Sequence, residues 1–183
     1  MDELAAATIG RTFNQYAKGA RAPVLRERIA RYLNERADAP ILLVGEAPGY
    51  RGTRVSGIPF TSERQLTGKG PAEATATIVH RVLGELGVED DVLLWNVVPT
   101  HPGTASSNRP PTHVEIEAGK PFLRDLARGR RVIAVGRVAH GVRGGDYVRH
   151  PSRGGAELFR GGVDLLVCAG HRTERRRKRR SVR

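Results

Sequence analysis

Three residues with hydrogen-bonding side chains stand at the ends of short apolar runs. Glu46 follows the run 41–45, Asn96 follows 92–95, and His150 comes two residues after 146–148. An amide such as that of Asn96 supplies both a donor and an acceptor, so it can read a polar ring, and a carboxylate or an imidazole can take part in proton transfer. The sequence therefore offers a candidate site for a polar ring-shaped ligand.

Each of these residues also has an ordinary structural interpretation. Glu46 could be an incidental carboxylate in a solvated turn, and His150 beside Pro151 is unremarkable alone. Asn96 is either a structural amide or a reader of a ligand, and its place near the end of its run favours the second. Phe60 closes a polar loop and is either a core plug, the commoner case, or a stacking surface.

The elements that would position these residues are short buried strands. Unbroken apolar runs predict strands at 41–44, 91–98 and 131–136, with a shorter strand at 146–148. In open parallel sheets ligands bind at the carboxyl ends of the strands, where Glu46 would be presented. The glycines after the first strand would let the backbone approach a ligand.

Helix signals lie between these strands. Helices are expected from Pro23, from Pro71 to a stop at Gly87, and from a capping box at Thr112 that is interrupted at 119–121. Short helices are expected at 138–142 and 156–160, with one more capped by Thr61 or Ser62. We expect residues 1–22 to be loose and 51–60 to form a loop, whereas 163–169 fits a strand or a helix.

Composition indicates a polyanionic partner, a nucleic acid rather than a membrane. The 183 residues carry a formal charge of +12, and the run 175–180 is entirely basic. With one cysteine, Cys168, an internal disulfide is impossible, and no metal cluster or other cofactor is expected. The sequence Gly68-Lys69-Gly70 lacks the spacing of a phosphate loop. Neither a signal sequence nor a membrane span is evident, so we expect a cytoplasmic, nucleoid-associated monomer.

The ordered motifs resemble the uracil-DNA glycosylase superfamily. The segments that carry the resemblance are Gly45-Glu46-Ala47-Pro48-Gly49, Gly57-Ile58-Pro59-Phe60, Trp95-Asn96-Val97-Val98, Asn108-Arg109-Pro110-Pro111 and Arg149-His150-Pro151-Ser152. They are similar to the iron–sulfur branch, but that branch needs four cysteines, so the chain looks closer to cluster-free bacterial members.

The resemblance implies an α/β fold, a three-layer α/β/α sandwich with a four-stranded parallel sheet. It also implies roles for four residues in removing uracil from DNA. Phe60 would stack on the extruded base, Asn96 would bind its Watson–Crick edge, and His150 would donate to O2 as charge builds there. Glu46, or backbone beside it, would position the attacking water.

The same resemblance extends to the residues around the base and along the DNA. Gly45 and Ala47 would line the base pocket, and five residues would contact DNA: Arg51, Asn108, Arg109, Ser152 and Arg153. Many members have an Asp where Ala47 stands, and others have a Tyr at the place of Gly49 that excludes the thymine methyl. Gly154 stands where the best-known branch carries a wedging Leu, with Arg153 as a substitute.

Three rival interpretations stay open. The fold could serve a glycosylase for mismatched thymine or deaminated purines, a non-catalytic DNA-binding protein, or an unrelated nucleotide-binding domain. In all of them the sequence predicts one domain, residues 1–170, followed by a basic disordered tail, 171–183.

Overall fold

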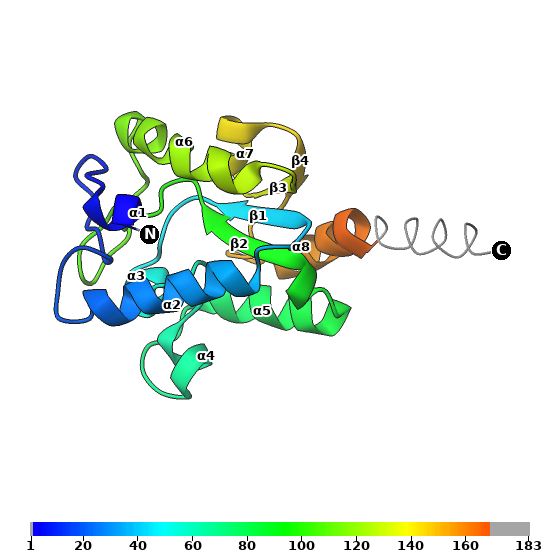
Figure 1. The fold of residues 1–183 in the computed structure, drawn as a ribbon. Helices are drawn as coiled ribbons and strands as arrows, with labels where there is room; N and C mark the ends of the chain where they lie inside the picture. The colour runs from blue at the N-terminus through cyan, green and yellow to red at the C-terminus, as the bar shows by residue number, and fades with distance from the viewer. Residues whose placement is uncertain (1, 169–183) are drawn as a thin grey trace.

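The central feature of the computed structural model, which describes residues 2–168, is a four-stranded sheet in the order β2-β1-β3-β4 (Figure 1). Every neighbouring pair is parallel, and Gly45 at the end of β1 is in register with Asn96 at the end of β2. The predicted parallel α/β sheet is therefore confirmed. The strands are β1 (Ile41–Gly45), β2 (Val92–Asn96), β3 (Arg131–Val135) and β4 (Asp146–Val148).

Helices lie on both faces of this sheet. The chain forms α1 (Asp2–Ala6), α2 (Ala22–Glu35), α3 (Thr53–Ser56), α4 (Glu63–Thr67), α5 (Ala74–Leu86), α6 (His113–Ala127), α7 (Arg137–Arg143) and α8 (Ala156–Val163). A 3₁₀ turn, η1 (Glu89–Asp91), precedes β2, and a π-helical turn, η2 (Asp164–Cys168), follows α8. Residues 163–168 of the segment predicted as strand or helix are therefore helical.

Alternation along β1 explains why its sequence is apolar throughout. In β1, Leu42 and Val44 join the core beneath α6 and α7, whereas Ile41 and Leu43 join the core beneath α5 and α8. Successive side chains of a strand point to opposite faces, so a sheet covered twice needs apolar residues at every position. The edge of β2 is also covered, because the Leu94 amide donates to the Tyr32 hydroxyl of α2 at 2.7 Å.

The amino-terminal segment is packed onto the domain, contrary to the prediction that residues 1–22 are loose. Phe13 forms an antiparallel bridge with His101, and the Asn14 amide donates to the Leu4 and Ala7 carbonyls. Tyr16 is buried, and its hydroxyl donates to the Gly57 carbonyl at 2.8 Å. These contacts attach the segment to the loops beside the carboxyl ends of β1 and β2.

Several boundaries also differ from the sequence prediction. Helix α6 runs through Pro121 without interruption, because both of its halves pack on the same core. Helix α3 lies inside the segment predicted as a loop, and α5 begins at Ala74 rather than at Pro71. The expected disorder of 171–183 concerns residues outside the described part of the chain.

The capping box at the start of α6 is confirmed, and its buried Glu115 carboxylate forms an ion pair with the partly exposed Arg109. Glu115 is 1% exposed and accepts hydrogen bonds from the Arg11 and Thr112 amides and from both terminal nitrogens of Arg109. The Arg109 guanidinium, partly offset by burial, lowers the pKa of Glu115 to about 2. A carboxyl group whose pKa is lowered by folding stabilises the fold above its unfolded pKa, and this stabilisation is lost as the pH falls through the folded value.

Glu115→Gln should therefore lower the free energy of unfolding by about 2–3 kcal/mol at pH 7. The difference from wild type should shrink steadily from about pH 5 toward pH 2, where the wild-type carboxylate also takes up a proton. Urea unfolding across this range measures it, with Glu117→Gln, on the exposed side of the same helix, as the control. A deficit that does not change with pH would contradict the assignment.

Candidate active site

The four residues singled out by the sequence line one small pocket at the carboxyl edge of the sheet. Glu46, Phe60, Asn96 and His150 all border a cavity of about 50 Å³. They come from the turn after β1, the segment before α4, the end of β2 and the loop after β4. The strands that carry three of them are parallel, so their carboxyl ends meet at this edge.

Asn96 reaches the pocket with an unused amide. The residue is 4% exposed, and within residues 2–168 its side chain forms no hydrogen bond. Its amide atoms are not among the fully buried, unpartnered side-chain atoms of the described residues, so they are open to the pocket and available to a polar ligand. The structural alternative required partners for this amide, so the geometry favours a ligand reader.

Phe60 is both part of the core and a wall of the pocket. It is 8% exposed and packs with the cluster beneath α5 and α8. Its φ of +53° lies in the left-handed region, which is uncommon for a residue with a bulky side chain. Such strain persists only where the surroundings impose it, and it gathers at functional sites.

Gly45 sets how closely the Phe60 ring approaches Asn96. A Cβ atom at Gly45 would collide with the edge of the Phe60 ring and would lie 2.9 Å from Asn96 Oδ1. The bare backbone of Gly45 therefore allows the ring and the amide to lie side by side. This gives the predicted pocket residue Gly45 a steric role.

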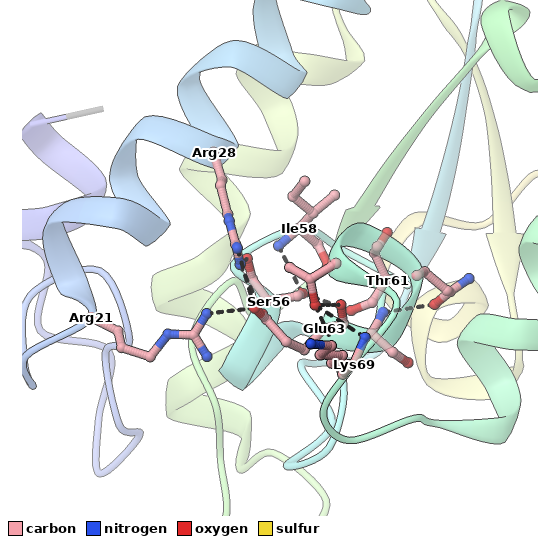
Figure 2. A network of polar contacts seen from close by, with 10 residues as sticks. Arg21, Arg28, Ser56, Ile58, Thr61, Glu63 and Lys69 are labelled. Carbon is pink, nitrogen blue, oxygen red and sulfur yellow. Dashed lines mark hydrogen bonds and ion pairs between the residues drawn. The ribbon is translucent and has the colours of Figure 1, made fainter.

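A polar network holds the strained segment around Phe60 (Figure 2). The Ser56 hydroxyl donates to the Thr61 carbonyl at 2.6 Å and accepts from the Ile58 amide at 3.1 Å. Next to it, Glu63 pairs with Arg21 and Arg28 of the α2 region, each at 2.8 Å. These contacts fix the backbone on both sides of Phe60, so the ring does not depend on a ligand for its position.

Phe60→Ala should separate the two roles of this ring. Loss of core packing would cost about 3–5 kcal/mol of stability, and loss of a stacking surface would lower activity on a flipped base by an amount equivalent to ~1–3 kcal/mol. We expect a clear fall in single-turnover rate per folded molecule, measured with thermal melting on the same samples. The control is Phe122→Ala, which removes a partly buried ring from the opposite core. A lower melting temperature with unchanged activity would leave Phe60 only a structural role.

Glu46 lies where the small pocket meets a larger one. It is half-buried and borders both cavities, and within residues 2–168 its carboxyl group has no hydrogen-bond partner. Burial raises the pKa of Glu46 above its usual value. A carboxylate with a raised pKa is a stronger base near neutral pH, which suits proton transfer.

His150 is oriented by the residue that follows Pro151. The Ser152 amide donates to Nδ1 at 3.2 Å, and the Ser152 hydroxyl lies 2.8 Å from the same nitrogen. Because Nδ1 accepts these bonds, the hydrogen bonding assigns the proton of the neutral ring to Nε2. Burial, and secondly the charge of Arg149, lowers the pKa of His150. His150 is thus a neutral ring with a fixed Nε2–H donor.

The larger cavity is lined by basic side chains. Its volume is about 540 Å³, and Arg137, Arg149 and Arg153 contribute to its walls together with Ser152. It opens directly beside Glu46 and His150. The arrangement places positive charge next to the small pocket, as a polyanion requires.

The five residues predicted to contact DNA have different surroundings. Arg153, with φ of +51°, and Ser152 line the basic cavity, and the exposed Arg51 lies over the Tyr50 ring. Asn108 Oδ1 accepts from the Tyr50 amide at 2.9 Å. Arg109 is held by Glu115, so its charge is already paired. DNA contact by these five residues stays a prediction.

Four further residues of the site were missed by sequence reasoning. Glu73, just before α5, borders the small pocket, as do Thr53 and Thr75. His101 is fully buried, and its two ring nitrogens lie 2.7 and 2.8 Å from the carbonyls of Pro48 and Thr104. It thereby joins the turn after β1 to the loop after β2. The only sequence signal for Glu73 would have been Gly49 and Gly52, which are far from it in the chain. His101, in contrast, lies in the loop that follows the Asn96 strand.

Two negative findings apply to residues 2–168. No group of three or more side chains there has the composition and spacing to hold a metal ion. None of the helices in that part of the chain combines the length and the apolar character needed to cross a bilayer.

Comparison with known proteins identifies the class to which this fold and site belong. The family model described as the uracil DNA glycosylase superfamily matches residues 32–175, which is most of the chain. The chain therefore belongs to the uracil DNA glycosylase superfamily, and its fold is that of a DNA repair glycosylase. A search of curated protein sequences finds no match.

Among solved structures, the crystal structure of wild-type SMUG2 from Pedobacter heparinus has the same fold. Its TM-score is 0.66, and the alignment covers 95% of this chain and 96% of that chain. Sequence identity is 14%, so this likeness concerns the fold alone.

Proposed function

We propose that the protein hydrolyses the N-glycosidic bond of uracil in DNA. The observation that carries the proposal is the small pocket, in which the unpartnered Asn96 amide lies beside the Phe60 ring and which Glu46 and His150 also line. Family membership supplies the reaction class. The base pocket indicates which base is the substrate, because an amide that both donates and accepts matches O4 and N3–H of uracil.

Binding begins with extrusion of the base. A base within a duplex cannot reach a buried pocket, and flipping it out costs a few kcal/mol. Stacking on Phe60 recovers about 1–3 kcal/mol of this cost. The arginines of the larger cavity would hold the flanking phosphates, which positions the strand without reading its sequence.

Bond cleavage then depends on charge that develops on the departing base. The Nε2–H of His150 would donate to O2 as the glycosidic bond lengthens, and this stabilises the negative charge of the uracil anion. Glu46 would hold the water that attacks C1′ and would accept its proton. The products are free uracil and an abasic site, with no covalent enzyme intermediate.

The experiment that tests the proposal uses a single-stranded and a duplex oligonucleotide, each with one uracil, followed by alkaline cleavage. Strand breaks should appear at the uracil, remain when EDTA is present, and be absent from the matched thymine oligonucleotide. Cleavage of only mismatched thymine or deaminated purines would assign another lesion to the same fold. Tight binding without an alkali-labile site would assign a non-catalytic role. Monomeric state and nucleoid location stay predictions from the sequence.

A further inference from the structure

The position of Glu73 is fixed by its neighbours before α5. Its amide donates to the Ser62 hydroxyl at 2.8 Å, and Ser62 also caps α4 directly after the Phe60 segment. The backbone of Glu73 is therefore tied to the segment that presents Phe60. Its side chain extends from there into the small pocket.

Two glycines of the turn after β1 make room for the Glu73 carboxyl group. A Cβ atom at Gly49 would lie 2.5 Å from Oε1 and 2.6 Å from Oε2, and one at Gly52 would overlap Oε2 outright. The carboxyl group thus occupies the space that a side chain at either position would need. Glu73 therefore forms the wall of the pocket at Gly49, although it lies 24 positions further along the chain.

This carboxyl group has no hydrogen-bond partner within residues 2–168. Glu73 is half-buried, and burial raises its pKa above the usual value. A half-buried carboxyl group without a protein partner has to keep its water or bind a ligand, because removing its remaining hydration without a replacement costs free energy. A ligand that fills the pocket beside Gly49 therefore contacts the Glu73 carboxyl group, next to which an apolar surface is unfavourable.

The edge of the base that reaches this wall follows by elimination, on the basis of the proposed function. Asn96 takes O4 and N3–H, His150 takes O2, and Phe60 takes one face of the ring. Glu46 holds the attacking water in the proposed function. What remains of a pyrimidine is the C5–C6 edge, and the charged group of the pocket lining that is still unassigned is Glu73. We propose that Glu73 is the specificity-determining residue that excludes a methyl group at C5, and so separates uracil from thymine.

The physical basis is space together with hydration. Uracil carries only a hydrogen at C5, which leaves room for the carboxyl group and its water. The methyl group of thymine would need the same volume and would displace that water with an apolar surface. Discrimination by one methyl group amounts to about 10- to 200-fold in kcat/KM.

The test compares uracil and thymine, each opposite guanine, under single-turnover conditions with the full chain. Glu73→Ala should lower the uracil-to-thymine rate ratio at least tenfold, chiefly by raising thymine excision. Glu73→Gln preserves the size and polarity of the side chain and should keep the ratio within about threefold of wild type. Glu85→Ala, on an exposed part of α5, is the matched control.

A second measurement does not depend on catalysis. Free thymine should raise the melting temperature of Glu73→Ala as much as free uracil does, whereas wild type should respond to uracil only. A wild-type ratio in Glu73→Ala, or equal responses of the wild-type protein to both bases, overturns the role of Glu73. If the oligonucleotide assay shows no uracil excision by wild type, the proposed function fails, and the base-binding comparison still decides the role of Glu73.

Discussion

His150→Ala is expected to slow base excision by about a hundred- to a thousandfold while changing DNA affinity little. Uracil in intact DNA is neutral, so a donor at O2 gains little before the bond breaks. As the bond lengthens, negative charge moves onto the ring and the same hydrogen bond strengthens. An interaction that forms mainly in the transition state raises the rate rather than the affinity.

Single-turnover rates with enzyme in excess measure this step apart from product release. His113→Ala, at an exposed position on α6, is the control for loss of an imidazole. Because the Ser152 amide donates to Nδ1 of His150, the ring should already be oriented before DNA binds. A variant with a wild-type single-turnover rate and weak DNA binding would reassign His150 to positioning of phosphates.

Asn96→Asp is expected to lower uracil excision by on the order of a hundredfold. An ionised carboxylate cannot donate to O4, and its second oxygen would face that atom with lone pairs. The size of the side chain is unchanged, so the contacts with Gly45 and Phe60 should persist. The fold should also persist, because the Asn96 amide has no hydrogen bond within residues 2–168 that could be lost.

The measurement is the excision rate for uracil, cytosine and thymine, each placed in the same duplex. Some activity on cytosine is expected, since its amino group can donate to a carboxylate. Asn34→Asp, on the exposed side of α2, adds the same charge away from the site. Unchanged uracil kinetics would mean that Asn96 is a structural amide after all.

Much of the fold could be predicted because a buried parallel strand appears in the sequence as a short run of consecutive apolar residues. The run 41–45 is apolar at every position since both faces of β1 are covered, and this alone predicts a central strand. Three site residues then follow from the rule that the carboxyl ends of such strands share an edge. For Phe60 the residues alone left a core plug and a stacking surface open, and the sequence resemblance favoured stacking.

Other features depend on contacts that local patterns do not encode. Pro121 predicts a break in α6, but packing of both halves of the helix on one core outweighs the lost hydrogen bond. The Glu73 carboxyl group lies in space that Gly49 and Gly52 leave free. This contact joins residues far apart in the chain, so only the three-dimensional structure shows it. The tautomer of His150 likewise depends on the Ser152 amide rather than on residue type.

The short strand β4 has a consequence for how the site could fail. Within residues 2–168 it pairs through three residues with β3 and with no other strand, whereas β1 pairs with strands on both sides. Edge segments with little pairing open by local fluctuation more readily than central ones. The loop that carries His150 follows this strand directly, so partial unfolding at the edge would remove the proposed donor while the proposed base pocket around Gly45 stays assembled. If the proposed function holds, mild heat or denaturant should therefore first give a protein that still binds the base but no longer releases it from DNA.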